Sequence, residues 1–448
     1  MQYSIIQKSQ LEGAHRMDAE YYQPEYLDLE KKLDSVKTKT VEDISKSVVS
    51  FGAYSLTSYI EWQESGVPYV NVGDIHDGYI DTSDIKHISE KVDEILKKSR
   101  VQNGQVLLTM AGTIGNAAVA HNLVNHMNAN QAIAKITPSG VSPYYLAAFL
   151  NSKYGLLQTR REIVSSVQAN IFLGPIKKFR VPIFDKKLME EIENKYQDFL
   201  STLEHSQLLY SQAENLLLEE LGLKNFESED ELWSVVNFSE VKKANRVDAE
   251  YFQPKYDKLL KCLKNSKSLI DIAKRITRRS EIVPQKEYSY IEISDVNVGS
   301  GEVINNLILG KELPANAKIK ITGGELLVSK VRPTRGAIAI IPDEWKKDII
   351  ASGAFSVFEM PSPEREYIQV VLRSTIGKLQ MERPTTGTSY PTITDEDVES
   401  IVIPISPKSI QQKIAELVQK SHESRKKAKE LLGEAKHRVE EMIEKEEK

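Results

Sequence analysis

One eleven-residue stretch occurs twice in the sequence and decides how the chain is organised. Residues 16–26 read RMDAEYYQPEY, residues 246–256 read RVDAEYFQPKY, and eight of the eleven positions are identical. The shift of 230 residues is far longer than the roughly 20 to 50 residues of a solenoid repeat, so each copy must be a domain with its own core. The sequence therefore predicts a duplicated unit that offers two similar surfaces to its partners.

The duplication continues along both halves, but the loops differ. TMAGT at residues 109–113 stands opposite SKVRP at residues 329–333. A scaffold that is retained while its loops diverge is typical of two binding sites with different specificity. Neutral drift, which would spread the differences evenly, is the alternative. The matching segments are 70–75 with 291–296, 104–108 with 324–328, 167–171 with 389–393, and 179–182 with 401–404.

The composition is that of an ordinary soluble protein. Of the 448 residues, 40% are hydrophobic and 27% are charged, and no apolar run approaches the ~20 residues of a membrane span. The first residues lack the layout of a signal peptide. The single cysteine, Cys262, excludes an internal disulfide framework and a thiolate metal cluster. We therefore expect a cytoplasmic protein with no membrane partner.

The net charge of −5 would argue against a nucleic-acid partner if it were evenly spread. Residues 219–250 hold nine acidic and four basic side chains, which accounts for the whole excess, whereas residues 274–335 hold eleven basic and seven acidic ones. Because charge acts within a Debye length of ~10 Å, the basic region of the second copy is compatible with DNA. A solvated polar face is the alternative for each of these side chains.

Each copy is predicted to be an α+β domain that a long helix closes. Short β-branched and aromatic runs predict strands at 67–72, 105–109, 337–341 and 355–358, and residues 143–150 and 366–372 predict helices. After Pro182 and after Pro404, apolar and small residues recur at alternating steps of four and three, which is a heptad pattern. The two sets are Ile192, Tyr196, Phe199, Leu203, Ser206, Tyr210, Ala213 and Leu217, and Ile410, Ile414, Leu417, Ser421, Ser424, Ala428, Leu431 and Ala435.

The two long helices can bury their apolar seams against each other. With a pseudo-twofold relation between the copies they would form an antiparallel intramolecular coiled coil that separates the two globular domains like a ruler. Packing on the globular domains is the alternative. The predicted division is 1–184 for the first globular domain, 185–222 for the first long helix, 223–405 for a linker and the second globular domain, and 406–448 for the second long helix.

These features together resemble the specificity subunit of type I restriction-modification systems. The repeated opening motif, a variable domain and a closing helix in each half carry the resemblance, which covers nearly the whole chain. It implies two target recognition domains that each read one half of an asymmetric bipartite site in double-stranded DNA, with the helices setting the spacer. It also implies methyltransferase (modification) subunits, two of them, and restriction/translocase subunits as partners. The closing helices share mainly apolar register, such as Ile192 with Ile414 and Ala213 with Ala435, which leaves open whether they bind partners equivalently.

The sequence holds no catalytic, metal or cofactor motif. An amino-methyltransferase NPPY-like tetrapeptide, a GxGxxG after a strand and a phosphate-binding P-loop are all missing. PDEWK at residues 342–346 resembles part of a nuclease motif, but adjacent carboxylates on an extended chain point to opposite sides, which favours a turn. His121 and His126 do not have the i, i+4 spacing of a metal pair. We therefore expect a non-catalytic subunit of a multisubunit enzyme, with no catalytic residues, no metal and no cofactor.

The candidates for reading DNA are donor-bearing residues in loops at equivalent places of the two copies. Arg suits guanine, Asn and Gln suit adenine, and Ser and Thr contact bases or phosphates. In the first copy they are Thr109, Thr113, Asn116, Asn130, Gln131, Arg160, Arg161, Ser165, Ser166, Gln168 and Asn170. In the second copy they are Lys330, Arg332, Thr334, Arg335, Arg373, Arg383, Thr385, Thr386, Thr388, Ser389 and Tyr390. Residues 385–389 could equally be a helix N-cap.

The repeated motif residues are expected to be structural, because readers of two different sequences should not keep the same side chains. They are Arg16, Asp18, Glu20 and Tyr21, and Arg246, Asp248, Glu250 and Tyr251. Three alternative functions stay open at this point. They are a specificity-like subunit of a methyltransferase without a restriction partner, a coiled-coil scaffold with two peptide-binding heads, and a stand-alone enzyme.

Overall fold

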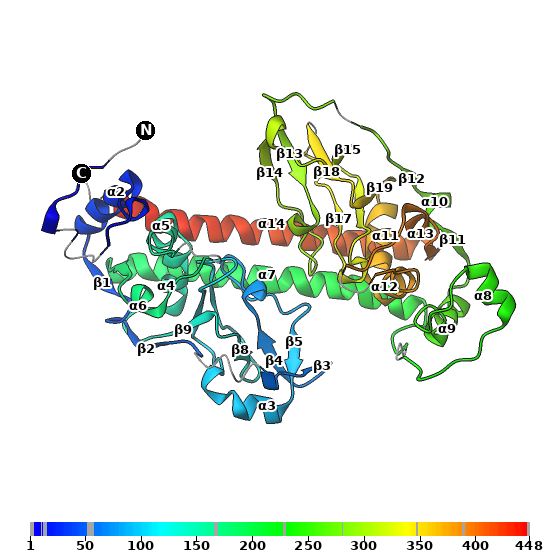
Figure 1. Ribbon diagram of the computed structural model, residues 1–448, viewed down its shortest axis with the longest axis horizontal. Helices are drawn as coiled ribbons and strands as arrows, with labels where there is room; N and C mark the ends of the chain where they lie inside the picture. Colours follow the sequence, from blue (N-terminus) through cyan, green and yellow to red (C-terminus); the bar gives the residue numbers. More distant parts are fainter. Residues whose placement is uncertain are drawn as a thin grey trace. The chain divides into compact units, whose positions relative to one another are not determined.

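The computed structural model describes residues 4–9, 11, 16–51, 58–164, 169–226, 230–279, 281–345, 348–387 and 390–445. The chain forms two compact units, which are Met1–Leu203 with Lys426–Lys448, and Glu204–Arg425. Both units are α+β, as the sequence predicts (Figure 1). Within the described residues, no helix combines the length and the apolar character that a membrane span requires.

The first unit contains two four-stranded sheets. The antiparallel sheet has the order β2-β9-β6-β7, and the other has the order β3-β5-β4-β8, in which β4 and β8 are parallel. A short ladder pairs β1 with β10. The strands are β1 Thr38–Thr40, β2 Ser45–Val49, β3 Trp62–Gln63, β4 Val67–Val70, β5 Lys86–Ile88, β6 Val106–Thr109, β7 Ala117–Val119, β8 Asn128–Ala129, β9 Ile133–Pro138 and β10 Arg180–Pro182. The helices are α2 Pro24–Asp34, α3 Glu90–Ile95, α4 Pro143–Leu150, α5 Lys153–Arg161 and α6 Leu173–Lys177.

The second unit repeats the antiparallel sheet and the short ladder, whereas the parallel pair of its mixed sheet is central instead of at the edge. Its antiparallel sheet has the order β12-β19-β16-β17, its mixed sheet has the order β14-β13-β18-β15 with β13 and β18 parallel, and β11 pairs with β20. The strands are β11 Ser266–Ser268, β12 Lys274–Arg275, β13 Glu287–Ile291, β14 Asn306–Leu309, β15 Ala317–Ile321, β16 Leu326–Ser329, β17 Ile338–Ile340, β18 Ile349–Ser352, β19 Phe355–Glu359 and β20 Val402–Pro404. The helices are α8 Phe238–Ala244, α9 Pro254–Cys262, α10 Leu269–Ile272, α11 Glu364–Arg373, α12 Thr375–Glu382 and α13 Asp395–Glu399. The predicted strands coincide with β4, β6, β17 and β19, and the predicted helices coincide with α4 and α11.

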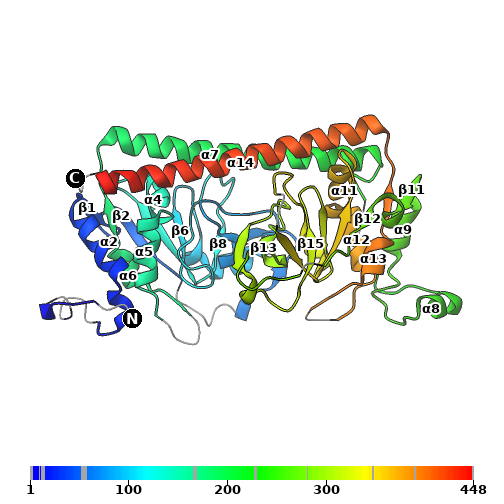
Figure 2. The same cartoon turned by 90° about the horizontal axis from the view of Figure 1, so that it is seen from above.

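One helix in each unit lies between the antiparallel sheet and the long helices, as Figure 2 shows for α11. The last six residues of α4 and the last eight of α11 are buried, because each helix packs on two sides. Tyr145 Oη donates to the carbonyl oxygen of Pro182 at 2.7 Å, and Tyr367 Oη donates to that of Pro404 at 2.7 Å. The same tyrosine therefore ties the same helix to the last strand in both copies.

The long helices are α7, Lys186–Glu220, and α14, Lys408–Lys445. Each contributes one part to each unit, and within each unit the two parts run antiparallel. In the first unit, ion pairs join Lys195 to Glu434 at 2.5 Å and Glu191 to Arg438 at 3.2 Å. The predicted pairing of the two helices is thus confirmed. Helix α7 ends before Gly222, whose φ of 67° is the left-handed conformation that commonly terminates helices.

The predicted seam is correct for α7 but partly wrong for α14. Ile414, Ser421, Ala428 and Ala435 are buried as expected. The intervening buried positions, however, are Val418, Arg425, Leu432 and Val439, each one residue after Leu417, Ser424, Leu431 and the continuation of the predicted pattern. From the sequence alone, Arg425 argues against this register, because burying a charged side chain in a seam costs free energy unless partners lie nearby.

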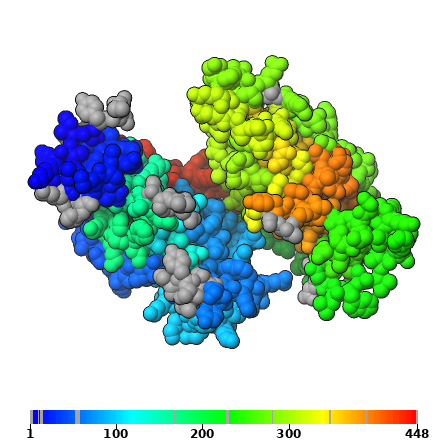
Figure 3. Space-filling view, in the orientation of Figure 1, coloured from blue at the N-terminus to red at the C-terminus, as the bar shows by residue number. Residues whose placement is uncertain are grey.

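In the first unit the N-terminal segment and α5 lie against each other on the face that Figure 3 shows. Arg161, at the end of α5, donates from Nε to the carbonyl oxygen of Tyr21 at 3.2 Å and pairs with Glu30 on α2. The repeated motif thus closes against the helical layer of its own unit.

Candidate nucleic-acid interface

The first candidate loop connects β6 to β7 and is held by Thr109, the last residue of β6. Thr109 is fully buried, and its hydroxyl donates to the carbonyl oxygen of Thr113 at 2.5 Å and accepts from the backbone N–H of Asn116 at 3.1 Å. The Asn116 side chain donates to the carbonyl oxygen of Ile75 at 3.0 Å. Thr109 therefore shapes the loop from below, whereas the Thr113 side chain is exposed.

A second segment of the first unit lies beside this loop. The backbone N–H of Met110 donates to Ala132 O at 2.8 Å, and the N–H of Ile171 donates to Met110 O at 2.9 Å. A bridge joins Ala111 to Asn170. We call residues 110–116 with residues 169–171 loop pair 1. It brings Thr113, Asn116 and Asn170 together with Asn130 and Gln131, which lie next to Ala132.

The second unit builds the same arrangement after β16. The N–H of Lys330 donates to Ala354 O at 2.8 Å, the N–H of Ile393 donates to Lys330 O at 2.9 Å, and a bridge joins Val331 to Thr392. We call residues 330–337 with residues 390–393 loop pair 2. The two loop pairs thus share their backbone links although their sequences differ.

Loop pair 2 gathers cationic and aromatic side chains. The Arg332 guanidinium lies 4.8 Å from the centre of the Tyr390 ring, and the Arg332 N–H donates to Pro391 O at 2.7 Å. Thr334 and Arg335 are exposed on the short 3₁₀ turn Pro333–Arg335, and Thr386 is exposed beside Thr392, to which it forms a bridge. A planar cation over an aromatic ring, next to the exposed Arg335, suits contacts to base edges or phosphates.

Several candidates instead hold the fold. The Lys330 Nζ pairs with Asp395 at 2.8 Å, and the Arg373 guanidinium is buried against backbone carbonyls. The Thr385 hydroxyl donates to Met381 O at 2.8 Å, and Arg161 is engaged by Tyr21 and Glu30. Arg160 is exposed at the end of α5. Ser165, Ser166, Gln168, Thr388 and Ser389 lie outside the described residues.

Ion pairs neutralise much of the basic region that the sequence indicated. Arg275 pairs with Asp395 and Glu399, and Arg278 pairs with Glu325. Burial alone would raise the pKa of Asp395, but hydrogen bonds from Lys330 and Ser356 lower it below its usual value. The carboxylate is therefore charged and compensates Arg275 and Lys330.

The repeated motif forms a clamp in both units. Arg16 pairs with Asp18 at 2.6 Å, and Arg246 pairs with Asp248 at 2.6 Å. The Tyr21 ring lies between two arginines, Arg16 at 4.7 Å and Arg161 at 4.1 Å. Because these contacts join residues of the same unit, they support a structural role for the motif.

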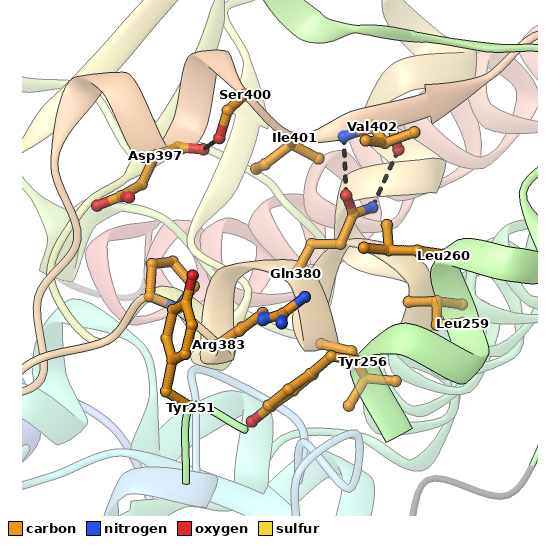
Figure 4. Close-up of a pocket in the computed structure, with 12 residues that line it drawn as sticks. Tyr251, Tyr256, Leu259, Leu260, Gln380, Arg383, Asp397, Ser400, Ile401 and Val402 are labelled. Atoms are coloured by element: carbon orange, nitrogen blue, oxygen red, sulfur yellow. Dashed lines mark hydrogen bonds between the residues drawn. The ribbon is translucent and has the colours of Figure 1, made fainter. Parts of the chain in front are cut away.

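Arg383 completes the equivalent clamp in the second unit. Figure 4 shows its guanidinium between Tyr251 and Tyr256, and the ring centres lie 4.9 and 5.7 Å from it. The same arginine pairs with Asp257 at 3.0 Å. It lines a pocket of about 180 Å³, where Gln380 exchanges hydrogen bonds with the backbone of Val402. The sequence placed Arg383 among the DNA readers because its partners, more than 120 residues away in the chain, cannot be seen from local pattern.

Within the described residues, no group of three His, Cys, Asp or Glu side chains is arranged to hold a metal ion. The arrangement of the two loop pairs supports recognition by hydrogen bonding and stacking.

The chain was compared with known protein families and with curated proteins. The type I restriction modification DNA specificity domain matches twice, at residues 34–214 and at residues 264–431. The specificity subunit of the type I restriction enzyme EcoBI from Escherichia coli is 26% identical over 143 residues, which are 31% of this chain and 29% of that protein. The HindI specificity subunit from Haemophilus influenzae is 27% identical over 161 residues, 34% of this chain and 33% of that protein. The match spans about a third of the length of these curated relatives.

Solved structures are also similar to this chain. The crystal structure of the type I restriction-modification S subunit from M. genitalium covers 92% of this chain and 95% of its own, with 13% identity and a TM-score of 0.38. The HsdS subunit from Thermoanaerobacter tengcongensis covers 92% of this chain and 96% of its own, with 12% identity and a TM-score of 0.28.

Proposed function

The chain belongs to the family of type I restriction modification DNA specificity domains, which it contains twice, and from this premise we propose that it is the non-catalytic subunit that selects the DNA site of a type I methyltransferase/restriction complex. Each unit reads one half of an asymmetric bipartite site in double-stranded DNA. The observation that carries the proposal is the shared backbone geometry of two loop pairs whose side chains differ. One scaffold with two sets of donors suits two half-sites of different sequence.

The proposed DNA-contacting residues are exposed or half-buried candidates in and beside the loop pairs, with Arg160 at the end of α5. In the first unit they are Thr113, Asn116, Asn130, Gln131, Arg160 and Asn170, and in the second unit Arg332, Thr334, Arg335, Thr386 and Tyr390. The remaining described candidates have structural roles in the loops or elsewhere in their own unit; they are Thr109, Arg161, Lys330, Arg373, Arg383 and Thr385. Ser165, Ser166, Gln168, Thr388 and Ser389 stay predictions from the sequence.

The partners and the division of labour follow from the same proposal. Residues 1–184 and 223–405 contain the two target recognition domains, and the helices within residues 185–222 and 406–448 set the spacer between half-sites. Two methyltransferase subunits, one for each copy of the duplicated surface, and restriction/translocase subunits assemble on the chain in the cytoplasm. No cofactor is assigned to this chain, since methyl transfer and cleavage belong to the partners.

The proposal is tested by binding of the full chain to duplex DNA of random sequence over a range of salt concentrations. Neutralised phosphates release counterions, so the logarithm of the affinity should fall linearly with the logarithm of salt concentration. Mapping of methylated sites in a host that expresses the chain with its methyltransferase subunit should then reveal a bipartite motif. Binding without salt dependence would favour the peptide-binding scaffold instead.

A further inference from the structure

Two different residues occupy the same position behind the two loop pairs. Asn151 follows α4 and Arg373 ends α11, and the neighbouring Ser152 and Ser374 cap the next helix in both units. All four side chains are buried. The position is therefore equivalent in the two copies, although one residue is neutral and the other is a cation.

In the first unit, Asn151 holds the residue at which the loop of loop pair 1 becomes β7. Its Oδ1 accepts from the N–H of Ala117 at 3.0 Å, and its Nδ2 donates to the carbonyl oxygen of Ala117 at 2.7 Å. The same carbonyl oxygen accepts from the N–H of Gly78 at 3.1 Å, and Tyr196 on α7 donates from its hydroxyl to Gly78 O at 2.6 Å. A chain of hydrogen bonds thus runs from α7 to the end of the loop.

Gly78 makes this contact with the helix layer unusually close. Its φ is +88°, and a Cβ atom there would lie 2.9 Å from both the Phe199 ring and the Leu432 side chain. The backbone therefore touches α7 and α14 directly within the first unit, because no side chain intervenes.

In the second unit, Arg373 performs the same task with a guanidinium. Its Nη1 donates to Gly336 O at 3.0 Å and to Ile338 O at 3.3 Å, and its Nη2 donates to Val298 O at 2.9 Å and to Gly299 O at 2.7 Å. Its Nε donates to the hydroxyl of Tyr210 on α7 at 2.8 Å. An arginine has five N–H donors, and the contacts of Arg373 supply five acceptor atoms for them.

The loop that Arg373 holds needs external support. Arg332 and Gly336 flank the 3₁₀ turn, both in the left-handed region, with φ of 49° and 83°. A non-glycine residue in that region is strained and persists only when its surroundings fix it. The carbonyl oxygen of Gly336, at the end of the turn that presents Thr334 and Arg335, is fixed by Arg373.

We propose that Arg373 and Asn151 are positioning residues that fix the two DNA-reading loops, and that Tyr210 and Tyr196 fasten these loops to α7. The inference rests on the proposed function, because it assigns the loops to DNA. Hydrogen bonds weaken steeply with distance and angle, so a loop released from its support should lose discrimination between bases while its charge, and hence its attraction to phosphate, stays in place.

The test compares variants of the full chain in selection from a pool of randomised duplexes, followed by sequencing. Tyr210→Phe removes one acceptor, and Arg373→Lys keeps the charge but removes most donors. Both should lower base discrimination by roughly tenfold at positions of one half-site and leave the other half-site unchanged. Tyr196→Phe is the matched variant in the first unit. It should lower base discrimination at the other half-site and leave the half-site read by the second unit unchanged.

Two readouts separate positioning from a general structural role. The intact half-site reports that the variant is folded, and the salt dependence on random duplex should equal that of the unsubstituted chain, because no phosphate-binding charge is lost. Full discrimination at both half-sites in Tyr210→Phe and Arg373→Lys would overturn the inference and leave the proposed function standing. Equal losses at both half-sites would overturn it as well, since they indicate global destabilisation. If the unsubstituted chain shows no salt-dependent binding to random duplex, the proposed function fails, and this inference fails with it.

Discussion

Ser206 and Ser421 exchange hydrogen bonds across the two long helices within the second unit. The Ser206 hydroxyl donates to Ser421 O at 2.8 Å, the Ser421 hydroxyl donates to Ser206 O at 2.7 Å, and both side chains are buried. Such reciprocal contacts require the helix backbones to approach closely, which only small side chains allow. The pair therefore defines the point at which α7 and α14 lie opposite each other in register.

We expect Ser206→Ala and Ser421→Ala to destabilise the protein by about 1 kcal/mol each, because each removes one buried hydrogen bond. The double variant should lose less than the sum, since the pair is one network. Ser206→Leu should cost about 1 to 3 kcal/mol through overpacking. Denaturant midpoints measure these changes.

Ser201→Ala is the matched control, because Ser201 is exposed on the same helix and its hydroxyl donates to Asp198 O, within its own turn. Its effect should stay within about 0.5 kcal/mol. Equal shifts for Ser201→Ala and Ser206→Ala would refute the role of the serine pair.

The scaffold could be predicted from the sequence because its signals are local. The heptad spacing that includes Ser206 predicted α7, and short apolar runs predicted strands such as β6 and β17. The register of α14 could not be predicted fully, because Arg425 is buried although it is charged. A charged residue gives a local signal for the surface, and only the fold shows its partners.

The candidate site was predicted less well, for the same reason. Arg335 and Arg373 look alike in the sequence, yet Arg335 is exposed and Arg373 is buried. The acceptors of Arg373 come from residues 35 to 163 positions away. Asn151 carried no signal at all, since a single asparagine after a helix is common at helix ends.

Arg335→Ala should relax one half of the bipartite site and leave the other half intact. A bidentate arginine contact contributes about 1 to 3 kcal/mol of base discrimination, so degeneracy is expected at one or two positions. Mapping of methylated sites in a host with the methyltransferase subunit measures it. Lys261→Ala, which removes an exposed cation from α9, is the control. Uniform weakening on all sequences would reassign Arg335 to a phosphate contact.

His422 on α14 should make the stability of the second unit depend on pH. Its Nε2 is buried without a hydrogen-bond partner among the described residues. Burial lowers the pKa of His422 to about 4, and the positive charges of Arg425 and Arg373 act in the same direction. The negative charges of Glu302 and Glu366 oppose this lowering. The folded state therefore resists protonation in a pH range in which an unfolded histidine, with a pKa of ~6.5, already binds a proton.

Because the unfolded state binds more protons between pH ~6.5 and ~4, the free energy of unfolding should fall as the pH falls through that range. Between pH 7.5 and pH 5.0 the contribution of His422 is about 2 kcal/mol. His422→Gln should remove this part of the pH dependence, as measured by denaturant midpoints at both pH values. His437→Gln, with 70% of that side chain exposed on the same helix, is the control. A wild-type pH profile in His422→Gln would contradict the prediction.

The last prediction concerns the spacer between the half-sites. Four residues inserted after Leu203 in α7, together with four after Glu423 in α14, lengthen both helices at positions that the Ser206–Ser421 pair places opposite each other. Each insertion adds about 6 Å of helix, close to two base-pair steps of ~3.4 Å. Four residues are about one turn, so the insertion is a stutter that largely keeps the apolar face in register.

Both half-sites should keep their sequences while the spacer grows by one or two base pairs, as mapping of methylated sites would reveal. Four residues inserted after Leu232, in an exposed segment outside the paired helices, should leave the spacer unchanged. An insertion in α7 alone should lower stability, because its seam loses the matching positions on α14. An unchanged spacer in an active double-insertion variant would show that the paired helices do not measure the distance between half-sites, and would return them to the role of an interaction scaffold.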